Sequence, residues 1–250
     1  RFRNDKNRIQ QKVLSPTDLL QGLEKLCRQL PGFSYDIKTF NMILDVAVHQ
    51  SPTGQEVQAA DTFMTYTRTV AETKPALLPN VVTWNQYLSY HVKYGGGGGT
   101  DTVDKIEDML RQMQSEDSGV EPDVISFTQL LNAWAASGLP EAPYTMEELL
   151  LQSIQQGTIK PDVFCWTLVI KAWASSGLPG AASKIASLLH RMEAEGGCTP
   201  NVFTYCHVLS FWAASGLTEA PTRAEEVLQR MAEEGACWII ARKVRSRATA

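Results

Sequence analysis

A chain of 250 residues with 44% hydrophobic residues and a formal net charge of −4 has the composition of a folded, soluble protein. It contains no run of about 18 apolar residues, so no membrane-spanning helix is predicted. Its five cysteines form no Cys-x-x-Cys pair and its four histidines have no ligand-like spacing, which argues for reduced thiols and against a zinc site. We therefore predict no metal and no other cofactor.

The N-terminal region divides into two segments. Residues 1–12 hold five Lys or Arg and one Asp, and we expect a basic tail or linker there. Residues 13–36 begin with Ser15-Pro16-Thr17-Asp18, which has the Ser cap, the early Pro and the acidic residue typical of a helix start. Leucines then fall on one broad face, so this segment is predicted to be the second helix of a half repeat.

The central part of the chain repeats itself every 39 residues. The stretch PDVISFTQLLNAWAASG at 122–138 returns as PDVFCWTLVIKAWASSG at 161–177 and as PNVFTYCHVLSFWAASG at 200–216. A fixed period of this size is typical of stacked helical hairpins. It defines three predicted repeats, residues 124–162, 163–201 and 202–240.

One copy shows how each hairpin is built. Asp123 can cap a helix that Gly138 ends. At 100° per residue, one face of this helix gathers the apolar residues, which predicts a core face made of Phe127, Leu130, Leu131, Trp134 and Ala135. The equivalent Trp173 and Trp212 are also predicted to be core residues. A second helix follows, and the hairpin needs neighbours to bury its apolar face.

Two earlier repeats and an incomplete end complete the array. Repeat 1, residues 37–80, is divergent, and repeat 2, residues 81–123, has the glycine run Gly95–Gly99 in its turn. A phosphate-binding loop would need a preceding strand and a following Lys-Ser or Lys-Thr, and neither is present. Repeat 5 fails near Ile240, where Asn should recur. Residues 241–250 form a basic tail, predicted to be a cap, a disordered arm or sequence from an imperfect gene model.

The first helices of repeats 2 to 5 contain no Asp or Glu, and the acids gather in the second helices. This distribution predicts a solvated acidic face, with a protein-binding surface as the alternative. On the first helices an apolar residue recurs away from the core, at Val82, Ile125, Phe164 and Phe203. A polar or thiol side chain follows three residues later, at Asn85, Thr128, Thr167 and Cys206.

Residues three apart are neighbours on a helix surface. An apolar shelf beside a hydrogen-bonding group suits an unstacked nucleobase, which needs stacking and edge contacts. The alternative is that the apolar residue packs on the next hairpin and the polar one is merely solvated.

The copies resemble pentatricopeptide repeats. The resemblance rests on the motifs PNVVTWN, PDVISFT, PDVFCWT and PNVFTYC, on the AWAASG helix end, and on Met192 and Met231 in second helices. It covers about residues 37–235, with a period longer than is usual in that family. The Trp, Leu-Gly and Tyr pattern of tetratricopeptide repeats is absent.

The resemblance implies an all-α fold, an α-solenoid of stacked helix-turn-helix repeats in a right-handed superhelix. It also implies binding of single-stranded RNA, one base per repeat. In the family two residues choose each base, which here gives the pairs Asn41 with Asn80, Asn85 with Asp123, Thr128 with Asp162, and Thr167 with Asn201. These pairs favour a pyrimidine, U, G and A from 5′ to 3′. Cys206 departs from the rule, and its partner position is Ile240.

By the same resemblance, Val82, Ile125, Phe164 and Phe203 would stack on bases and Lys93 would lie near a phosphate. The implied role is RNA processing, stability or translation in a mitochondrion or plastid. The alternative is a helical scaffold for protein partners. The chain has neither the His-x-Glu with Pro-Cys-x-x-Cys signature of deaminases nor a separate domain with clustered aspartates, so no enzyme activity is predicted.

Overall fold

The computed structural model describes residues 36–51, 54–72, 74–95, 99–115, 119–195 and 197–233, with the single positions 22, 25 and 29. The expected basic tails at 1–12 and 241–250, the helix of the half repeat and the end of repeat 5 lie outside the described residues. Within these ranges the chain forms ten α-helices and one short 3-10 helix, and no strand. The predicted all-α, solenoid-type repeat fold is confirmed.

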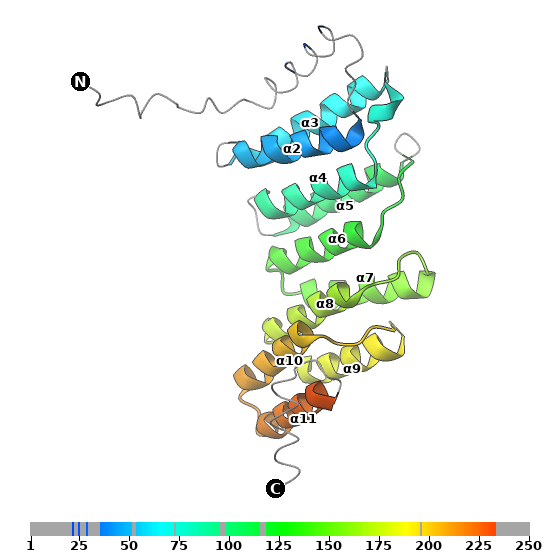
Figure 1. Ribbon diagram of the computed structural model, residues 1–250. Helices are drawn as coiled ribbons and strands as arrows, with labels where there is room; N and C mark the ends of the chain where they lie inside the picture. Colours follow the sequence, from blue (N-terminus) through cyan, green and yellow to red (C-terminus); the bar gives the residue numbers. More distant parts are fainter. Residues whose placement is uncertain are drawn as a thin grey trace, which may run out of the picture. The chain divides into compact units, whose positions relative to one another are not determined.

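Long helices alternate along the chain as the first and second helices of successive hairpins (Figure 1). The first helices are α2 (Ile37–Gln50), α4 (Val81–Tyr94), α6 (Val124–Ser137), α8 (Val163–Ser176) and α10 (Val202–Ser215). The second helices are α3 (Glu56–Ala71), α5 (Thr100–Gln114), α7 (Ala142–Gln156), α9 (Ala181–Ala194) and α11 (Ala220–Glu233). The 3-10 helix η1 (Pro75–Leu77) joins α3 to α4.

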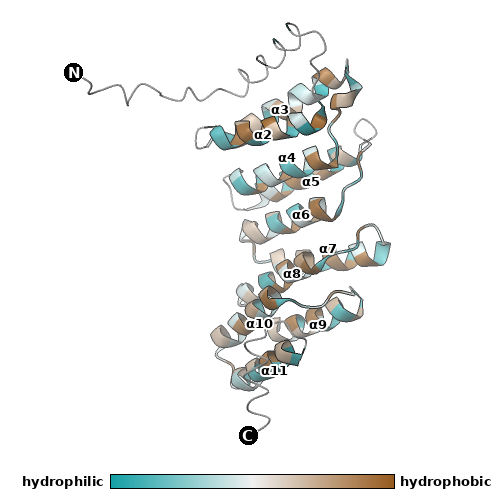
Figure 2. Ribbon diagram, viewed as in Figure 1, coloured by the Kyte–Doolittle hydropathy of each residue, from teal (hydrophilic) through white to brown (hydrophobic). Residues whose placement is uncertain are grey.

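The helices group into two compact units, residues 1–97 with 104–129, and residues 98–103 with 130–250. In the first unit α4 packs on α2 and α3. Phe40 lies at the centre of the α2–α3 core, edge-on to Phe63 at 5.4 Å and stacked on Tyr66 at 6.0 Å. In the second unit α8 packs on α7, α9 and α10, and α10 packs on α11. Every helix carries both polar and apolar residues (Figure 2).

The chain leaves α6, α8 and α10 through a glycine in the left-handed region. Gly138 has φ 69°, and Gly177 and Gly216 both have φ 64°, a conformation that costs glycine little. Gly95, at the equivalent point of repeat 2, is right-handed instead, with φ −64°. The predicted helix ends are therefore confirmed. In repeat 2, however, the chain leaves α4 without a residue in the left-handed conformation at Gly95.

The buried face of α6 differs from the predicted one. Phe127, Leu130 and Leu131 are buried, but Trp134 is only partly buried and Ala135 is exposed, while Ala133 is fully buried. The buried positions cover about half of the helix circumference. A first helix in a stack is covered on more than one side, so its buried arc is wider and centred differently from that of a simple amphipathic helix.

The turn between α6 and α7 is short and spans residues 138–141. Pro143 belongs to the first turn of α7, which begins at Ala142. Proline is favoured there because its fixed φ is helical and its missing N–H would have no partner. Among the described helices, none is long and apolar enough to cross a membrane.

Candidate nucleic-acid interface

The residue before a first helix caps that helix. The Asn80 Oδ1 atom accepts a hydrogen bond from the backbone N–H of Thr83 at 3.0 Å. The Asp123 Oδ1 atom accepts one from the N–H of Ser126 at 2.9 Å. The same role falls to Asp162 for α8 and Asn201 for α10. Because these side chains satisfy backbone N–H groups of the first turn, four predicted base-reading residues also have a structural role.

The predicted base-stacking residues all reach solvent. Their exposed fractions are 53% for Val82, 52% for Ile125, 57% for Phe164 and 73% for Phe203. Each is the second residue of its helix, two positions after the cap, and none is packed under a neighbouring hairpin. An exposed apolar side chain at a fixed place in successive helices is the arrangement that base stacking would need.

The predicted polar readers are more buried than a solvated position would be. Asn41 is 5% exposed, and Asn85, Thr128 and Thr167 are each 8% exposed. The hydroxyl groups of the two threonines donate to backbone carbonyls one turn earlier, both at 2.7 Å. Cys206, in repeat 5, is exposed. In repeats 1 to 4 these side chains are therefore held in fixed orientations.

The best-defined pair is Asn85 with Asp123. The Asn85 Nδ2 atom donates to Asp123 Oδ1 at 3.0 Å, and the Asn85 Oδ1 atom accepts from the Ser126 hydroxyl at 2.6 Å. Burial alone would raise the pKa of Asp123, but hydrogen bonds from the Ser126 backbone N–H, the Asn85 amide and the Ile125 backbone N–H outweigh it and leave this pKa below its ordinary value. Asp123 is therefore an ionised acceptor at neutral pH.

Five of the predicted residues line one cavity in the first unit, with a volume of about 390 Å³: Val82, Asn85, Lys93, Asp123 and Ile125. The two apolar residues come from successive first helices, α4 and α6. The structure thus brings together two predicted stacking residues, one predicted base-reading pair and the predicted phosphate contact. The cavity also includes residues that sequence reasoning missed, among them Gln86, Ser89 and Gln129.

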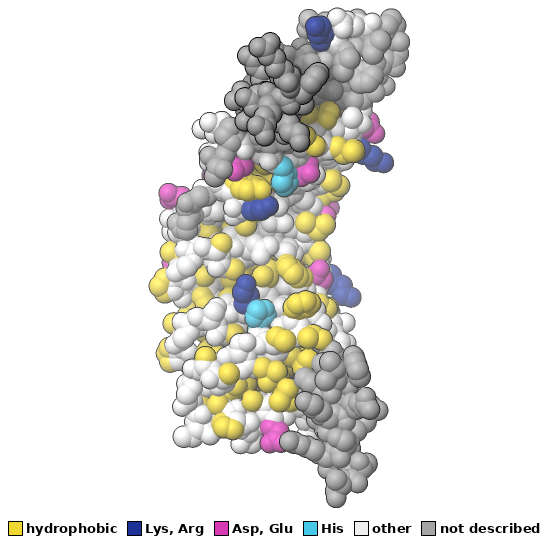
Figure 3. Space-filling view, turned by 60° about the vertical axis from the view of Figure 1, so that its left-hand side comes forward, with side chains coloured by type: hydrophobic (Ala, Val, Ile, Leu, Met, Phe, Trp, Pro, Cys, Tyr) yellow, Lys and Arg dark blue, Asp and Glu magenta, His cyan; other side chains and the backbone are white. Residues whose placement is uncertain are grey.

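The positive charge near this cavity is partly offset. The exposed Lys93 ammonium lies 4.7 Å from the centre of the Tyr94 ring. Asp45 also lines the cavity and accepts a hydrogen bond from the Tyr90 hydroxyl at 2.7 Å. Burial and Asp45 together raise the pKa of Tyr90 well above its usual range. Over the face shown in Figure 3, hydrophobic side chains are common at the surface and charged ones are few.

The third residue of a first helix was not recognised as functional from the sequence. Thr83, Ser126 and Thr204 are almost fully buried. The Thr83 hydroxyl donates to Asn41 Oδ1 at 2.9 Å, and those of Thr204 and Thr167 lie 2.7 Å apart. The sequence signal that could have identified them is the recurrence of Ser or Thr at the third position of a first helix. A buried hydroxyl needs a specific hydrogen-bond partner, so its recurrence indicates a conserved contact within the array.

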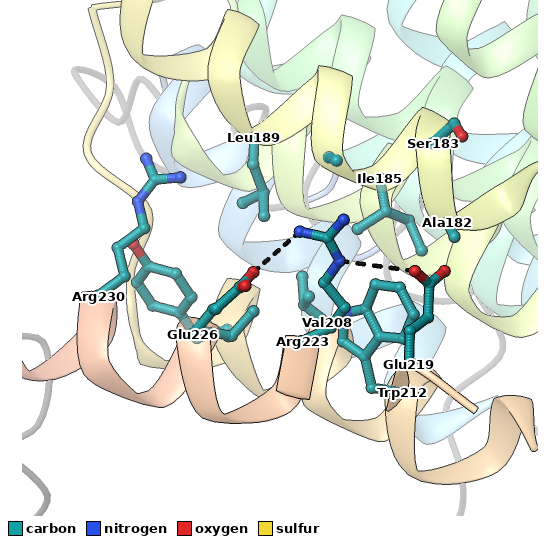
Figure 4. Close-up of a pocket in the computed structure, with 13 residues that line it drawn as sticks. Ala182, Ser183, Ile185, Leu189, Val208, Trp212, Glu219, Arg223, Glu226 and Arg230 are labelled. Atoms are coloured by element: carbon teal, nitrogen blue, oxygen red, sulfur yellow. Dashed lines mark hydrogen bonds and ion pairs between the residues drawn. The ribbon is translucent and has the colours of Figure 1, made fainter. Parts of the chain in front are cut away.

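A second cavity, of about 330 Å³, lies in the second unit between α9, α10 and α11 (Figure 4). Val208 and Trp212 contribute apolar walls, and Arg223 pairs with Glu226 at 3.0 Å and Glu219 at 3.9 Å. None of the predicted site residues lines it. Among the described residues no group of His, Cys, Asp and Glu could hold a metal ion, and Cys165, Cys198 and Cys206 are not in disulfides.

The chain is similar to proteins of known family. Residues 149–214 match the pentatricopeptide repeat domain family. Comparison with curated protein sequences gave no significant match. The fold is similar to the pentatricopeptide repeat domain of protein-only RNase P 1 from Arabidopsis thaliana, crystallised with tRNA. That similarity has a TM-score of 0.55 and 15% identity, over 85% of this chain and 98% of that one.

A second similar structure is the pentatricopeptide repeat protein PPR10 from maize. The TM-score is 0.54 and the identity 19%, over 92% of this chain, which spans only 33% of the maize protein. At 15% and 19% sequence identity, the similarity to these two structures shows only a shared fold. The family is indicated by the separate sequence match of residues 149–214. The match therefore places residues 149–214 in the pentatricopeptide repeat family, and the described hairpins, capped by Asp or Asn, share the fold of the two repeat proteins.

Proposed function

We propose that this chain binds single-stranded RNA with one base at each repeat, and that repeats 1 to 4 select a pyrimidine, U, G and A from 5′ to 3′. The observation that carries the proposal is the cavity in which Val82, Ile125, Asn85, Asp123 and Lys93 meet. A splayed base needs an apolar surface for stacking, hydrogen-bonding groups at its edge and a cation near its phosphate. The cavity offers all three.

The hydrogen-bonding capacity of Asn85 supports a base contact. A carboxamide has two N–H donors and an oxygen with two lone pairs. Asp123 takes one donor and Ser126 takes one lone pair. One donor and one lone pair remain, and a pyrimidine edge presents a complementary acceptor and donor.

The relatives support an RNA partner. The repeat domain of protein-only RNase P 1 was crystallised in complex with tRNA, and residues 149–214 of this chain belong to the same repeat family. From that relationship we propose a role in organellar RNA processing, stability or translation. We propose binding without catalysis, because the groups that meet in the cavity serve recognition.

Stacking contributes on the order of 1–3 kcal/mol per base. Four readable repeats, less the cost of ordering the RNA, give modest affinity. The selectivity between sequences is therefore a sharper test than the affinity itself.

The test is a titration of a short RNA containing pyrimidine-U-G-A, against a scrambled RNA of the same composition, at two salt concentrations. Selective binding of the first RNA that persists at the higher salt is the expected result. Equal binding of both would refute sequence reading, and cleavage or chemical change of the RNA would show an enzyme.

The second candidate is a protein-binding scaffold. Excluding the basic ends, residues 13–241 hold 14 basic and 26 acidic residues. An excess of acid repels RNA phosphates and suits a basic protein partner. A scaffold would bind neither RNA selectively.

A further inference from the structure

A buried hydroxyl from the following repeat contacts the polar reader in three places. Ser126 contacts Asn85, Thr83 contacts Asn41, and Thr204 contacts Thr167. These third-position residues are at most 1% exposed, so they cannot touch a base themselves.

Each hydroxyl also contacts the cap of its own helix. The Ser126 Oγ atom lies 3.1 Å from Asp123 Oδ1 and accepts from the Asp123 backbone N–H at 3.2 Å. Thr83 lies 3.1 Å from Asn80 Oδ1, and Thr204 lies 3.1 Å from Asn201 Oδ1. In repeats 1, 2 and 4, one hydroxyl therefore links the two residues of the predicted base-reading pair.

The consequence is clearest at Asn85, whose amide can be placed in two orientations that exchange oxygen and nitrogen. In the observed one, Nδ2 faces the Asp123 carboxylate and Oδ1 faces the Ser126 hydroxyl. In the exchanged orientation, the amide oxygen of Asn85 would face the carboxylate oxygen of Asp123, and neither atom could donate a hydrogen bond. Because the ionised carboxylate can only accept, Asp123 favours the observed orientation, and the Ser126 hydroxyl holds the amide in it by donating to Oδ1 at 2.6 Å.

The orientation matters because it decides where the unused donor and acceptor of the amide lie. Uracil and cytosine differ by exchanging an acceptor for a donor at the same edge position. An amide that rotates freely pairs with either base, whereas an amide held in one orientation pairs with one. Selectivity between the two pyrimidines therefore depends on what holds the amide.

We propose that Ser126 is a positioning residue that sets the preference of repeat 2 for U over C by fixing the Asn85 amide, and that Thr83 and Thr204 act likewise on the readers of repeats 1 and 4. This inference rests on the proposed function. In these repeats, a base-reading unit then consists of three residues: the polar reader, the cap residue paired with it, and the third residue of the next first helix.

The test compares Ser126→Ala with the parent protein on RNAs that carry U or C opposite repeat 2. We expect the U:C affinity ratio to fall about fivefold, the change that corresponds to one ordinary hydrogen bond. Ser126→Thr should restore the ratio, because Thr83 and Thr204 occupy this position elsewhere. Ser137→Ala removes another buried hydroxyl of α6, far along the helix, and is the matched control.

Base substitutions opposite repeats 1, 3 and 4 serve as the internal reference, because Ser126→Ala should leave the affinity changes that they cause unaltered. If the Ser126→Ala variant weakens U and C equally, the hydroxyl only stabilises the fold and the inference is wrong. If the parent selects U and the variant selects it as strongly, the inference is also wrong, while the proposed function stands. If the parent shows no selectivity at all, the proposed function itself fails.

Discussion

Thr128 and Thr167, which hold the same position in repeats 3 and 4, show how a single side chain could determine what a repeat offers to a base. Each hydroxyl donates its proton to a carbonyl of its own helix, at 2.7 Å. Because the proton is used in this way, each hydroxyl can meet a base only as a hydrogen-bond acceptor. An asparagine at the same position would bring N–H donors as well, which suit the carbonyl oxygen of uracil.

This difference predicts the effect of Thr128→Asn. The preference of repeat 3 should move from G toward U, measured by competition between RNAs that vary only at the third position. A preference that stays at G would show that the assignment of the pair Thr128 and Asp162 is wrong.

Asp162→Asn is the matched variant in the same repeat. An asparagine can keep the hydrogen bonds that Asp162 accepts from Phe164 and Cys165, both at 3.0 Å, so α8 should remain capped. The pair becomes the same as in repeat 4, and the preference should move from G toward A.

Trp173 is a core residue rather than a stacking platform. It is 1% exposed, lies edge-on to Tyr144 at 4.7 Å, and has the Lys184 ammonium 5.5 Å from its ring. We expect Trp173→Ala to lower the free energy of unfolding by about 3–5 kcal/mol, because it leaves a large cavity. Chemical denaturation measures this directly. Trp134→Ala should cost less, since Trp134 is only partly buried, and equal losses would contradict this account.

At the level of elements, a polar cluster joins α3, α4 and α5. His91 occupies the α4 position at which α6, α8 and α10 carry tryptophan. Its Nε2 atom lies 2.9 Å from Asp61 Oδ1, which also accepts from the Tyr87 hydroxyl at 2.6 Å. The Lys105 ammonium lies 3.8 Å from the other oxygen of Asp61.

The surroundings of His91 favour its neutral form. Burial and the charge of Lys105 lower the pKa of His91, and the attraction of Asp61 does not offset them. In the unfolded chain a histidine titrates near a pKa of about 6.5. The unfolded state therefore takes up more protons as the pH falls below about 6.5, and stability present above that pH is lost below it.

We expect the free energy of unfolding to fall between about pH 7.5 and 5.5, and His91→Leu to reduce that fall. Urea denaturation at several pH values measures both. His190→Gln, at an exposed histidine of α9, should leave the pH dependence unchanged. An identical pH dependence in His91→Leu and the parent would show that His91 does not cause it.

For the whole molecule, charge limits how strongly RNA can bind. The formal net charge is −4, and Lys93 is the only predicted phosphate contact. Each phosphate neutralised on a single strand contributes about −0.7 to the slope of log affinity against log salt concentration. A shallow slope is expected for selective binding.

Lys93→Ala should make that slope shallower by about 0.7 and weaken all RNA sequences by a similar factor, because an ammonium carries no base information. Titrations at four salt concentrations give the slope. Lys184→Ala removes a lysine that pairs with Glu147 at 2.8 Å on the second helices and should leave the slope unchanged. A loss of selectivity without a change of slope would mean that Lys93 does not contact phosphate.

Much of the fold could be predicted because it depends on local and periodic features. The caps Asp123 and Asp162, the glycines at 138 and 177, and the spacing of apolar residues are readable from any one copy. They determine where α6 and α8 begin and end, and the period determines that hairpins stack. The identity of the polar reader, Asn85 or Thr128, was likewise visible as a recurring position.

Only the tertiary structure decided what those readers touch. The bond between Ser126 and Asn85 joins residues 41 positions apart, and the one between Thr83 and Asn41 joins residues 42 apart. The partial exposure of Trp134 and the cluster around His91 arise in the same way. Helix periodicity describes one helix, whereas these contacts depend on the distance and rotation between helices, which side-chain packing sets only when the hairpins come together.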